Sequence, residues 1–379
     1  MRILIHCVYY PPEVGGLESH VAGLAEGLAE RGAEVRVITS RSRPELPLEE
    51  SASGIRIRRI PLPSRTAGGW ARYALASIPA TRRWARSADL VHAQSFASIL
   101  PAGVAARSAG RPWVASFHTS HFLVRSTRPA WIPVLSGLVR WPDHAFAASE
   151  EIRAVAENLG GGRRVEALTN GVDTARFRPP GNRRGRRPPT LVVPRRLVPK
   201  NGVEYFVRAL PGIRRRVPGV RVRLIGDGPE RERLEMLARG LQVEESLEFL
   251  GARPHAEMPE LLGSADIAIF PSLMEATSVA ALEAMACGLP VVATAVGGLA
   301  EIVDEEVGTL VPPANPDALA RAVATLLADA DLRKRGDAAR ARVAARWSND
   351  RLVERHLEVY GDLLAGRRVG NPSLPAGGG

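Results

Sequence analysis

The chain has 379 residues, of which 45% are hydrophobic and 24% charged. At roughly 100–200 residues per domain this length predicts two domains, and the composition excludes a largely disordered chain. Two cysteines, Cys7 and Cys287, exclude a disulfide framework and a multi-cysteine zinc site. No apolar stretch reaches the ~20 residues of a membrane span, and the first residues lack the pattern of a signal peptide, so we expect a cytoplasmic protein.

The net charge of +11 is unevenly distributed along the chain. Residues 51–142 hold thirteen arginines and a single acid, Asp89, which gives this stretch +12 and leaves the rest near zero. Such a region attracts an anionic partner such as a phospholipid surface or a phosphorylated substrate, or it is only a solvated arginine-rich face. A nucleic-acid partner is not expected, because the region lacks interleaved stacking aromatics and a helix-turn-helix signature.

The first half of the chain predicts alternating strands and helices. Residues 2–6 read as a strand, followed by a Pro/Gly loop, a helix with apolar residues at helical spacing, and a second strand over 34–39. Further strands are expected over 89–92, 113–117 and 144–147, and Ser149 is expected to cap the next helix. This order is typical of a doubly wound parallel α/β sheet.

The composition then changes and the same pattern starts again. Arginines and prolines dominate the stretch after residue 175, which predicts a linker. Strands are expected over 191–193, 220–225, 247–250, 267–270 and 291–294, separated by helices. The expected organisation is an N-terminal domain over 1–175, a linker over 176–190, a second domain over 191–346, a final amphipathic helix over 347–365 and a tail over 366–379.

The most informative motif is PSLMEATSVAALEAMACGLPVVATAVGG, residues 271–298. Thr277 or Ser278 is a suitable N-cap for a helix that starts at Val279, which places Glu275 before the helix and Glu283 inside it. Eight helical residues rise about 12 Å, so the two carboxylates are too far apart to flank one bond as a hydrolase pair does. They suit two separate binding contacts with an extended ligand, and the helix N-terminus between them suits phosphates. The alternative is an exposed Glu283 on an amphipathic helix.

Three weaker signals accompany this motif. Gly15 and Gly16, between the first strand and its helix, would let backbone N–H groups approach a phosphate, or they serve only loop geometry. Arg196 and Lys200 follow the first strand of the second domain and would neutralise a leaving diphosphate, or they continue the basic linker. His118 follows the strand over 113–117 and could contact the substrate, although a lone histidine is often structural.

In this order, the segments resemble family 4 of the retaining glycosyltransferases. The resemblance implies the GT-B fold, with two Rossmann-like domains facing across a cleft and a last helix that crosses back to the first domain. Its carriers are PPEVGGLESHVAGLAEGLAERGAEVRVIT, SFHTSH, TNGVDTARFRP, RRLVPKNGVEYFVRAL, VRLIGDGPERERLE and the motif over 271–298.

The resemblance also implies roles for individual residues. Glu283 would hold the nucleotide ribose and Glu275 the hydroxyls of the donor sugar, while Arg196 would stabilise the diphosphate. The family's usual lysine, five residues after that arginine, is Asn201 here, and Lys200 lies one residue earlier. The expected catalytic residues are His118, Arg196, Lys200 and Glu275. The expected donor-binding residues are Gly15, Gly16, Arg196, Lys200, Gly226, Arg253, Glu275, Thr277, Ser278, Val279 and Glu283.

The predicted function is retaining transfer of a sugar from a nucleotide diphosphate-sugar, a UDP- or GDP-sugar, without a metal or a cofactor. The first domain would bind the acceptor, a lipid or a phosphorylated anionic molecule, at the inner face of the membrane. A basic aromatic face for this purpose would comprise Trp70, Arg72, Tyr73, Arg82, Arg83, Trp84 and Arg86. The alternatives are transfer to a soluble small natural product or aminocyclitol, a nucleotide-sugar epimerase on the same fold, and a non-catalytic module that binds anionic surfaces.

Overall fold

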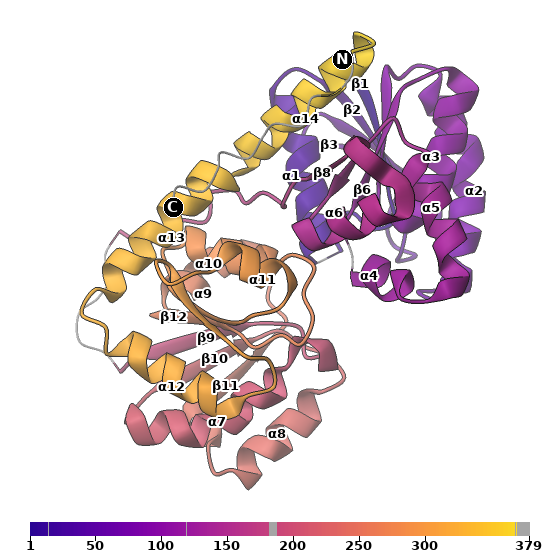
Figure 1. Cartoon of the computed structure of the whole chain (residues 1–379). Coiled ribbons are helices and arrows are strands. Elements are labelled where there is room, and N and C mark those ends of the chain that lie inside the picture. The colour runs from indigo at the N-terminus through magenta and orange to yellow at the C-terminus, as the bar shows by residue number, and fades with distance from the viewer. Residues whose placement is uncertain (14, 119, 182–187, 368, 370–379) are drawn as a thin grey trace. The chain divides into compact units, whose positions relative to one another are not determined.

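The computed structural model describes residues 1–13, 15–118, 120–181, 188–367 and 369 (Figure 1). The chain divides into two compact units. Unit 1 comprises Met1–Asn170 with Asn349–Gly379, and unit 2 comprises Gly171–Ser348. The division between the units falls after residue 170, five residues before the expected boundary. Residues 182–187 of the expected linker and 370–379 of the expected tail lie outside the described residues.

Unit 1 contains an eight-stranded sheet in the order β3-β4-β2-β1-β5-β6-β7-β8. All neighbouring strands are parallel apart from β3, which runs antiparallel to β4. The strands are β1 (Arg2–Cys7), β2 (Glu34–Arg41), β3 (Glu49–Ala52), β4 (Ile55–Pro61), β5 (Leu90–Gln94), β6 (Trp113–Phe117), β7 (His144–Ala147) and β8 (Val165–Ala167). The helices are α1 (Gly16–Glu30), α2 (Ala67–Ala85), α3 (Phe96–Ala109), α4 (Ser120–Ser126), α5 (Ile132–Arg140), α6 (Glu150–Ala156) and α14 (Asn349–Leu364).

The last helix, α14, is part of unit 1 although it follows unit 2 in the chain. Val353 packs so closely on α1 that a Cβ added at Gly27 would lie 2.6 Å from its side chain. The guanidinium of Arg355 donates two hydrogen bonds of 2.8 Å to the buried carboxylate of Glu166 on β8. Apolar packing and a paired buried charge therefore fix the helix to this sheet.

Unit 2 contains a six-stranded parallel sheet in the order β11-β10-β9-β12-β13-β14. Numbered from its own first strand this is the order 3-2-1-4-5-6 of a dinucleotide-binding fold, and its order reverses between β9 and β12. The strands are β9 (Thr190–Pro194), β10 (Arg221–Ile225), β11 (Leu247–Gly251), β12 (Ile267–Phe270), β13 (Val291–Thr294) and β14 (Gly308–Val311). The helices are α7 (Val203–Arg216), α8 (Arg231–Gly240), α9 (Met258–Gly263), α10 (Val279–Ala286), α11 (Gly297–Ile302), α12 (Pro316–Leu327) and α13 (Leu332–Arg346).

Strand alternation produces one core on each face of this sheet. Leu191 and Val193 pack with the helices α7, α8 and α12, whereas Val192 packs with α9, α10, α11 and α13. Figure 1 shows α7 and α12 on one side of the strands and α10 and α11 on the other. A strand buried on both faces reads as a continuous apolar run, which is why these strands are evident from the sequence.

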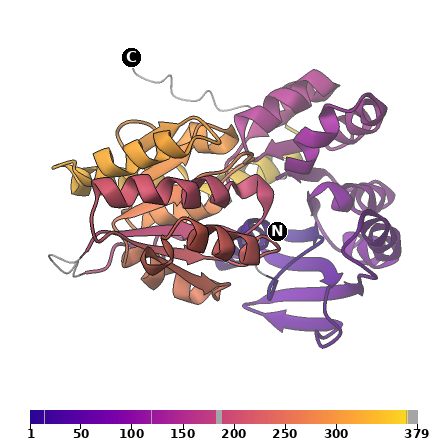
Figure 2. The same ribbon diagram turned by 90° about the horizontal axis from the view of Figure 1, so that it is seen from below.

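The strands expected over 113–117, 144–147, 267–270 and 291–294 are found with the same ends. The hairpin of β3 and β4 was not predicted, because β3 is the exposed polar sequence EESA (Figure 2). The interpretation of residues 176–190 as an unpacked linker is wrong at Phe177. Its side chain is buried in the unit 2 core, since an aromatic ring gains more from burial than the neighbouring arginines gain from solvent.

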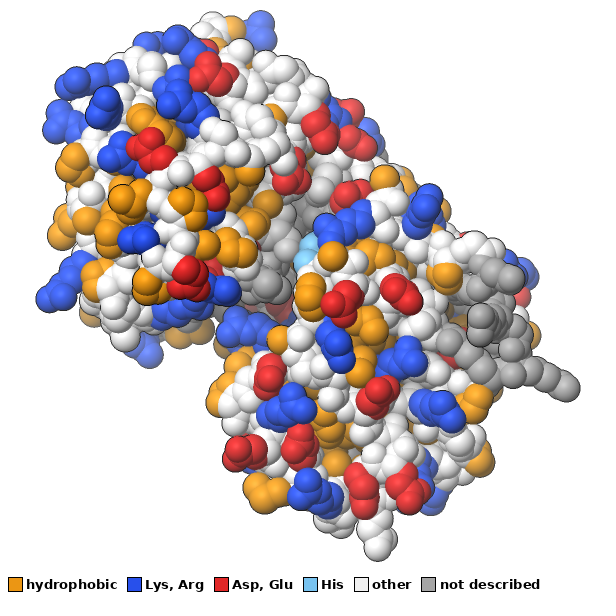
Figure 3. All heavy atoms as spheres, turned by 180° about the vertical axis from the view of Figure 1, so that it is seen from behind, with side chains coloured by type: hydrophobic (Ala, Val, Ile, Leu, Met, Phe, Trp, Pro, Cys, Tyr) orange, Lys and Arg blue, Asp and Glu red, His pale blue; other side chains and the backbone are white. Residues whose placement is uncertain are grey.

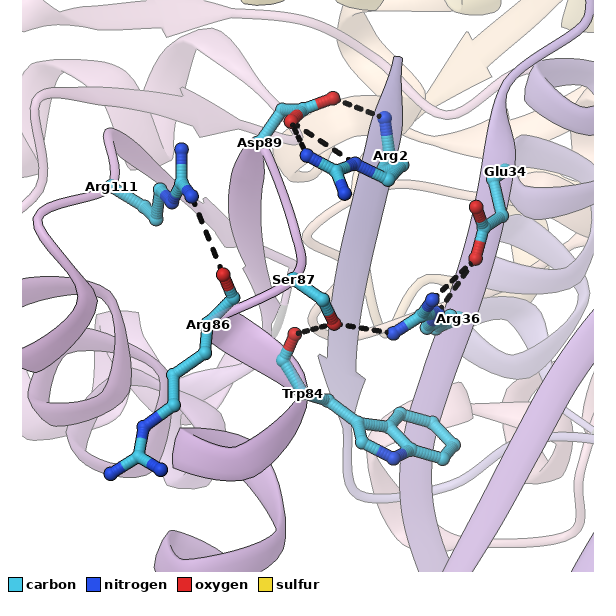
Figure 4. Close-up of polar contacts among 8 residues, drawn as sticks. All are labelled: Arg2, Glu34, Arg36, Trp84, Arg86, Ser87, Asp89 and Arg111. Carbon is cyan, nitrogen blue, oxygen red and sulfur yellow. Dashed lines mark hydrogen bonds and ion pairs between the residues drawn. The ribbon is translucent and has the colours of Figure 1, made fainter.

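Polar contacts at the amino ends of β1, β2 and β5 stabilise the sheet of unit 1 (Figure 4). Asp89 accepts hydrogen bonds from the backbone N–H of Arg2, at 2.8 Å, and from its guanidinium, at 2.7 Å. Arg36 pairs with Glu34 and also donates to Ser87. The single acid of residues 51–142 therefore pairs with an arginine outside that stretch.

Candidate active site

The first cluster of polar residues lies where the strand order of unit 2 reverses. The strands β9 and β12 are neighbours, and the carboxyl ends of parallel strands open at one edge of the sheet. Arg195 follows β9, and its Nη2 donates to Ser272 Oγ at 2.7 Å, to Asn201 Oδ1 at 2.9 Å and to the carboxylate of Glu275. The side chains of Arg195 and Glu275 are only 8% and 12% exposed.

The second cluster holds Glu283, the other carboxylate of the motif. Its side chain is 7% exposed, and Oε1 lies 2.7 Å from Nε2 of His255. His255 follows β11 and packs against the ring of Phe177 at a centroid distance of 5.3 Å. Each glutamate therefore has its own basic partner from a different strand end.

The N-terminus of α10 lies between the two glutamates in the chain. Ser278 caps it, as predicted, and its Oγ accepts a hydrogen bond from the backbone N–H of Ala281 at 3.4 Å. The first turn consists of the apolar sequence VAAL, so no acid in that turn compensates the helix dipole. Close packing holds the preceding loop, because a Cβ at Gly298 would lie 2.7 Å from the carbonyl oxygen of Ala276.

Of the two adjacent arginines, the structure buries Arg195 and exposes Arg196. The side chain of Asn201 is buried and donates to the carbonyl oxygen of Arg196 at 2.8 Å, in addition to its bond with Arg195. Desolvation lowers the pKa of Lys200, Arg195 and Arg196 add to this, and Glu275 opposes it. Lys200 therefore lies within the electrostatic field of the Glu275 cluster, while Asn201 serves to fix the loop.

Other predicted donor-binding residues have roles in the backbone or in packing. Gly226 has φ of 141°, and a Cβ there would lie 2.1 Å from the carbonyl oxygen of Arg195, so only glycine lets the two loops approach. Arg253 is exposed and donates to the carbonyl oxygen of Leu250 at 3.1 Å. Val279 is buried, and Thr277 is half-buried beside Gly298.

The remaining predicted residues belong to unit 1. His118 follows β6, and its Nε2 lies 2.6 Å from Oε1 of Gln94 at the end of β5. Its ring is 4.6 Å from that of His20 on α1, which brings the helix that follows Gly15 and Gly16 close to His118. Burial lowers the pKa of His118 to about 3, so the ring is neutral at pH 7.

The loop before α1 is less open to an anion than the N-terminus of α10. Glu18 lies in the first turn of α1, and a Cβ added at Gly15 would lie 2.3 Å from its carboxylate. An acid there already compensates the helix dipole. A phosphate role for Gly15 and Gly16 stays a prediction.

Two observations concern metal binding. Among the described residues there is no group of three or more His, Cys, Asp or Glu side chains that could hold a metal ion. The sequence contains an Asp-x-Asp triplet, Asp329–Asp331, between α12 and α13. Its carboxylates pair with Arg335, at 2.6 Å, and with Lys334, at 2.7 Å.

Exposed apolar side chains and arginines lie together on unit 1. Val134 on α5 is 48% exposed and Leu75 on α2 is 60% exposed. The guanidinium of Arg125 lies 5.0 Å from the ring centroid of Phe96 and 4.9 Å from that of Trp131. On the face drawn in Figure 3, arginines (blue) lie among hydrophobic side chains (orange) over unit 1, at the upper left.

Tyr73 does not belong to the predicted basic face. Its side chain is fully buried, and its hydroxyl donates to the carbonyl oxygen of Cys7 at 2.6 Å, because position 73 of α2 faces the sheet. No helix in the described part of the chain is both long enough and apolar enough to cross a membrane.

Two Rossmann-like units in one chain, with polar loops at the carboxyl ends of their strands, are the architecture of the GT-B fold. The crystal structure of the Anabaena protein HepE in complex with UDP-glucose is similar, with a TM-score of 0.77 and 22% identity over 96% of this chain and 100% of that one. Residues 14–176 match the family described as Glycosyltransferase Family 4, and residues 176–342 match Glycosyl transferases group 1.

Curated relatives match almost the whole chain. A GDP-mannose-dependent alpha-(1-6)-phosphatidylinositol monomannoside mannosyltransferase of Mycolicibacterium smegmatis is 32% identical over 95% of this chain and 97% of its own length. A glycogen synthase of Mycobacterium tuberculosis is 30% identical over 99% of this chain and 98% of its own. The chain belongs to glycosyltransferase family 4.

Proposed function

We propose that the chain transfers a sugar from a UDP- or GDP-sugar to an acceptor hydroxyl with retention of the anomeric configuration, without a metal. The observation that carries this proposal is the placement of Glu275 and Glu283, nearly buried, on either side of the N-terminus of α10. A relative that is GDP-mannose-dependent by its name and a fold neighbour solved in complex with UDP-glucose support this donor class.

In the proposed reaction, Glu283 holds the ribose hydroxyls and Glu275 the hydroxyls of the donor sugar. The backbone N–H groups of α10, with Arg196 and Lys200, stabilise the diphosphate as the bond between the anomeric carbon and the phosphate oxygen breaks. The acceptor oxygen attacks from the same face, and its proton passes to the leaving diphosphate. The neutral His118 contributes a hydrogen bond near the transferred sugar and not a positive charge. Catalysis then consists of positioning and charge stabilisation.

The test is thermal unfolding with UDP, GDP and ADP, for the wild type and for Glu283→Ala. A nucleotide at a hundred times its Kd should stabilise the native state by about 2.7 kcal/mol. We expect UDP or GDP to raise the Tm of the wild type and to leave that of Glu283→Ala unchanged. An equal response of both proteins, or no response to any nucleotide, would overturn the assignment.

For the acceptor, we propose a lipid or a phosphorylated molecule that unit 1 binds at an anionic membrane surface. The arginines and exposed apolar side chains of unit 1 suit such a surface, and the mycobacterial relative acts on a phosphatidylinositol mannoside by its name. We expect co-sedimentation with vesicles that contain phosphatidylglycerol and little binding to phosphatidylcholine alone. Equal binding to both, or to neither, would favour a soluble acceptor.

A further inference from the structure

Arg195 is the cation most deeply placed in the candidate active site, and the motif had pointed to its neighbour Arg196. The side chain of Arg195 is 8% exposed, with its guanidinium carbon 5.8 Å from the ring centroid of Phe270. A single nitrogen, Nη2, donates to Asn201, Ser272 and Glu275. Its partners come from the loops after β9 and β12, the two strands between which the sheet order reverses.

The backbone at Arg195 is fixed as firmly as its side chain. Its N–H donates to the carbonyl oxygen of Ile225 at 2.9 Å, and its own carbonyl lies so close to Gly226 that any Cβ there would collide with it. The position and direction of the Arg195 side chain relative to the sheet are therefore fixed. Such rigid support is what a binding group needs when it must hold another group in one geometry.

The charge of Arg195 is costly to bury and has a carboxylate as its counter-charge. A buried guanidinium is retained only when it is paired and hydrogen-bonded, and an apolar side chain would fill this space at lower cost. Since its partner Glu275 carries a binding role in the proposed reaction, a function in placing that carboxylate explains why the charge is there.

We propose that Arg195 is a positioning residue that holds Glu275 oriented toward the donor sugar. Arg195 binds Oε2 of Glu275, which assigns Oε1 to a sugar hydroxyl. Asn201 and Ser272 accept hydrogen bonds from the guanidinium and thereby fix its orientation. This inference rests on the proposed function and deepens it, because it separates the residue that positions Glu275 from those that contact the diphosphate.

The variants that test it are Arg195→Gln, which removes the charge, and Arg195→Lys, which keeps a charge in another geometry. Arg239→Gln, at an exposed position of α8, is the matched control for loss of one arginine in unit 2. The readouts are the Kd of UDP and GDP, and kcat and KM for the steady-state release of nucleoside diphosphate from UDP- and GDP-sugars.

For Arg195→Gln we expect the Kd of the nucleoside diphosphate to change less than threefold, because Glu275 contacts the sugar and not the nucleotide. We expect kcat to fall about 100-fold, as for loss of a group that positions a reacting partner. The KM of the sugar donor should change less than kcat, because the Glu275 carboxylate is still present and only its orientation is lost.

For Arg195→Lys we expect kcat to stay low, because an ammonium keeps the charge but cannot reproduce the hydrogen bonds of the guanidinium to Asn201, Ser272 and Glu275. A second route relocates the charge. Asn201 Oδ1 lies 2.9 Å from Arg195 Nη2, so the double change Arg195→Ala with Asn201→Lys places an ammonium in the same space. We expect it to recover at least tenfold of the activity that Arg195→Ala loses.

The outcomes separate the inference from the proposed function. If the wild type releases nucleotide and a folded Arg195→Gln has wild-type kcat, the positioning role is wrong. If Arg195→Gln does not fold, a folded Arg195→Lys with wild-type kcat also overturns it. If the wild type binds no nucleoside diphosphate and releases none from either sugar donor, the proposed function fails, and the inference fails with it.

Discussion

The two units differ in the titratable groups that they bury. In unit 2 each carboxylate of the motif has a base beside it: Arg195 for Glu275 and His255 for Glu283. Unit 1 buries Glu166, which pairs with Arg355, and in addition six histidines, which are His6, His20, His92, His118, His144 and His356. The difference indicates that the stability of unit 1 depends more strongly on pH in the range where histidine titrates.

Burial makes the contribution of the unit 1 histidines to the free energy of unfolding depend on pH. Burial lowers the pKa of His6 and His118 to about 3 and that of His356 to about 4, from 6.5 in the unfolded chain. Between these values the unfolded state binds more protons than the native state. Stability from these groups is therefore complete above pH 6.5 and is lost as the pH falls.

The largest expected effect is selective acid unfolding of unit 1. Below pH 6.5, each of these three histidines lowers the free energy of unfolding of unit 1 by about 1.4 kcal/mol for every pH unit. Together they lower it by about 4 kcal/mol per pH unit. Since a domain has about 5–15 kcal/mol of stability, we expect unit 1 to unfold between about pH 5 and pH 4. Peptide-resolved hydrogen exchange would locate the transition. Tryptophan fluorescence would follow it, because five of the six tryptophans lie in unit 1: Trp70, Trp84, Trp113, Trp131 and Trp141.

Unit 2 provides the internal control for this prediction. Hydrogen bonds from Arg233 and Arg208 lower the pKa of Glu204 below 4.5. The stability that Glu204 gives to unit 2 is therefore present above pH 4.5 and is lost only as the pH falls further. A single transition of both units at one pH, or a unit 1 that stays folded at pH 4, would contradict the comparison. His356→Gln should reduce the pH slope of unit 1 by about 1.4 kcal/mol per unit.

The contrast between the units also explains what could be predicted from the sequence. The strand over 267–270, the cap at Ser278 and the pair of Glu275 and Glu283 are local patterns, and the structure has the strand and the cap where they were expected. Which of Arg195 and Arg196 is buried beside Glu275 could not be predicted, because this depends on how the loop after β9 crosses Gly226. The sequence did contain a sign of this crossing, because a glycine directly after a strand, here Gly226, indicates that two backbone segments approach closely.

Hydrogen bonds between residues that are far apart in the sequence cannot be predicted from local sequence patterns. His255 and Glu283 are 28 residues apart and come together only when β11 and β12 take their places in the sheet. Likewise, His92 and Tyr360 share a hydrogen bond of 2.6 Å across 268 residues. Periodicity shows that His92 lies in a strand, but only the assembled core shows that α14 supplies its partner.

The next effect in size concerns the base beside Glu283. We expect His255→Ala to weaken binding of UDP or GDP about tenfold, which corresponds to about 1.4 kcal/mol, because the Glu283 carboxylate loses the group that fixes Oε1. Titration calorimetry at pH 7.5 measures this directly. Glu257→Gln, an exposed change in the same short helical turn, is the control and should bind as the wild type does. Equal affinities for His255→Ala and wild type would mean that Glu283 is held by its own helix alone.

The smallest expected effect compares two helix caps, one in each unit. Ser149 caps α6 and Ser278 caps α10, and each hydroxyl accepts a backbone N–H three residues ahead. Ser→Ala should therefore cost about 1 kcal/mol of unfolding free energy at either position, measured by urea denaturation. The helices differ in their first turns, since α6 begins with Glu150 and Glu151 and α10 with apolar residues.

The two acids of α6 already compensate its dipole, whereas α10 has its positive end available. Ser278→Ala should for that reason also weaken binding of the nucleoside diphosphate about threefold, since a frayed first turn presents fewer aligned N–H groups, and Ser149→Ala should leave that affinity unchanged. Equal losses of stability with equal affinities would show that the diphosphate is held by side chains and not by α10. A weaker affinity for Ser149→Ala alone would reverse the roles of the two helix ends.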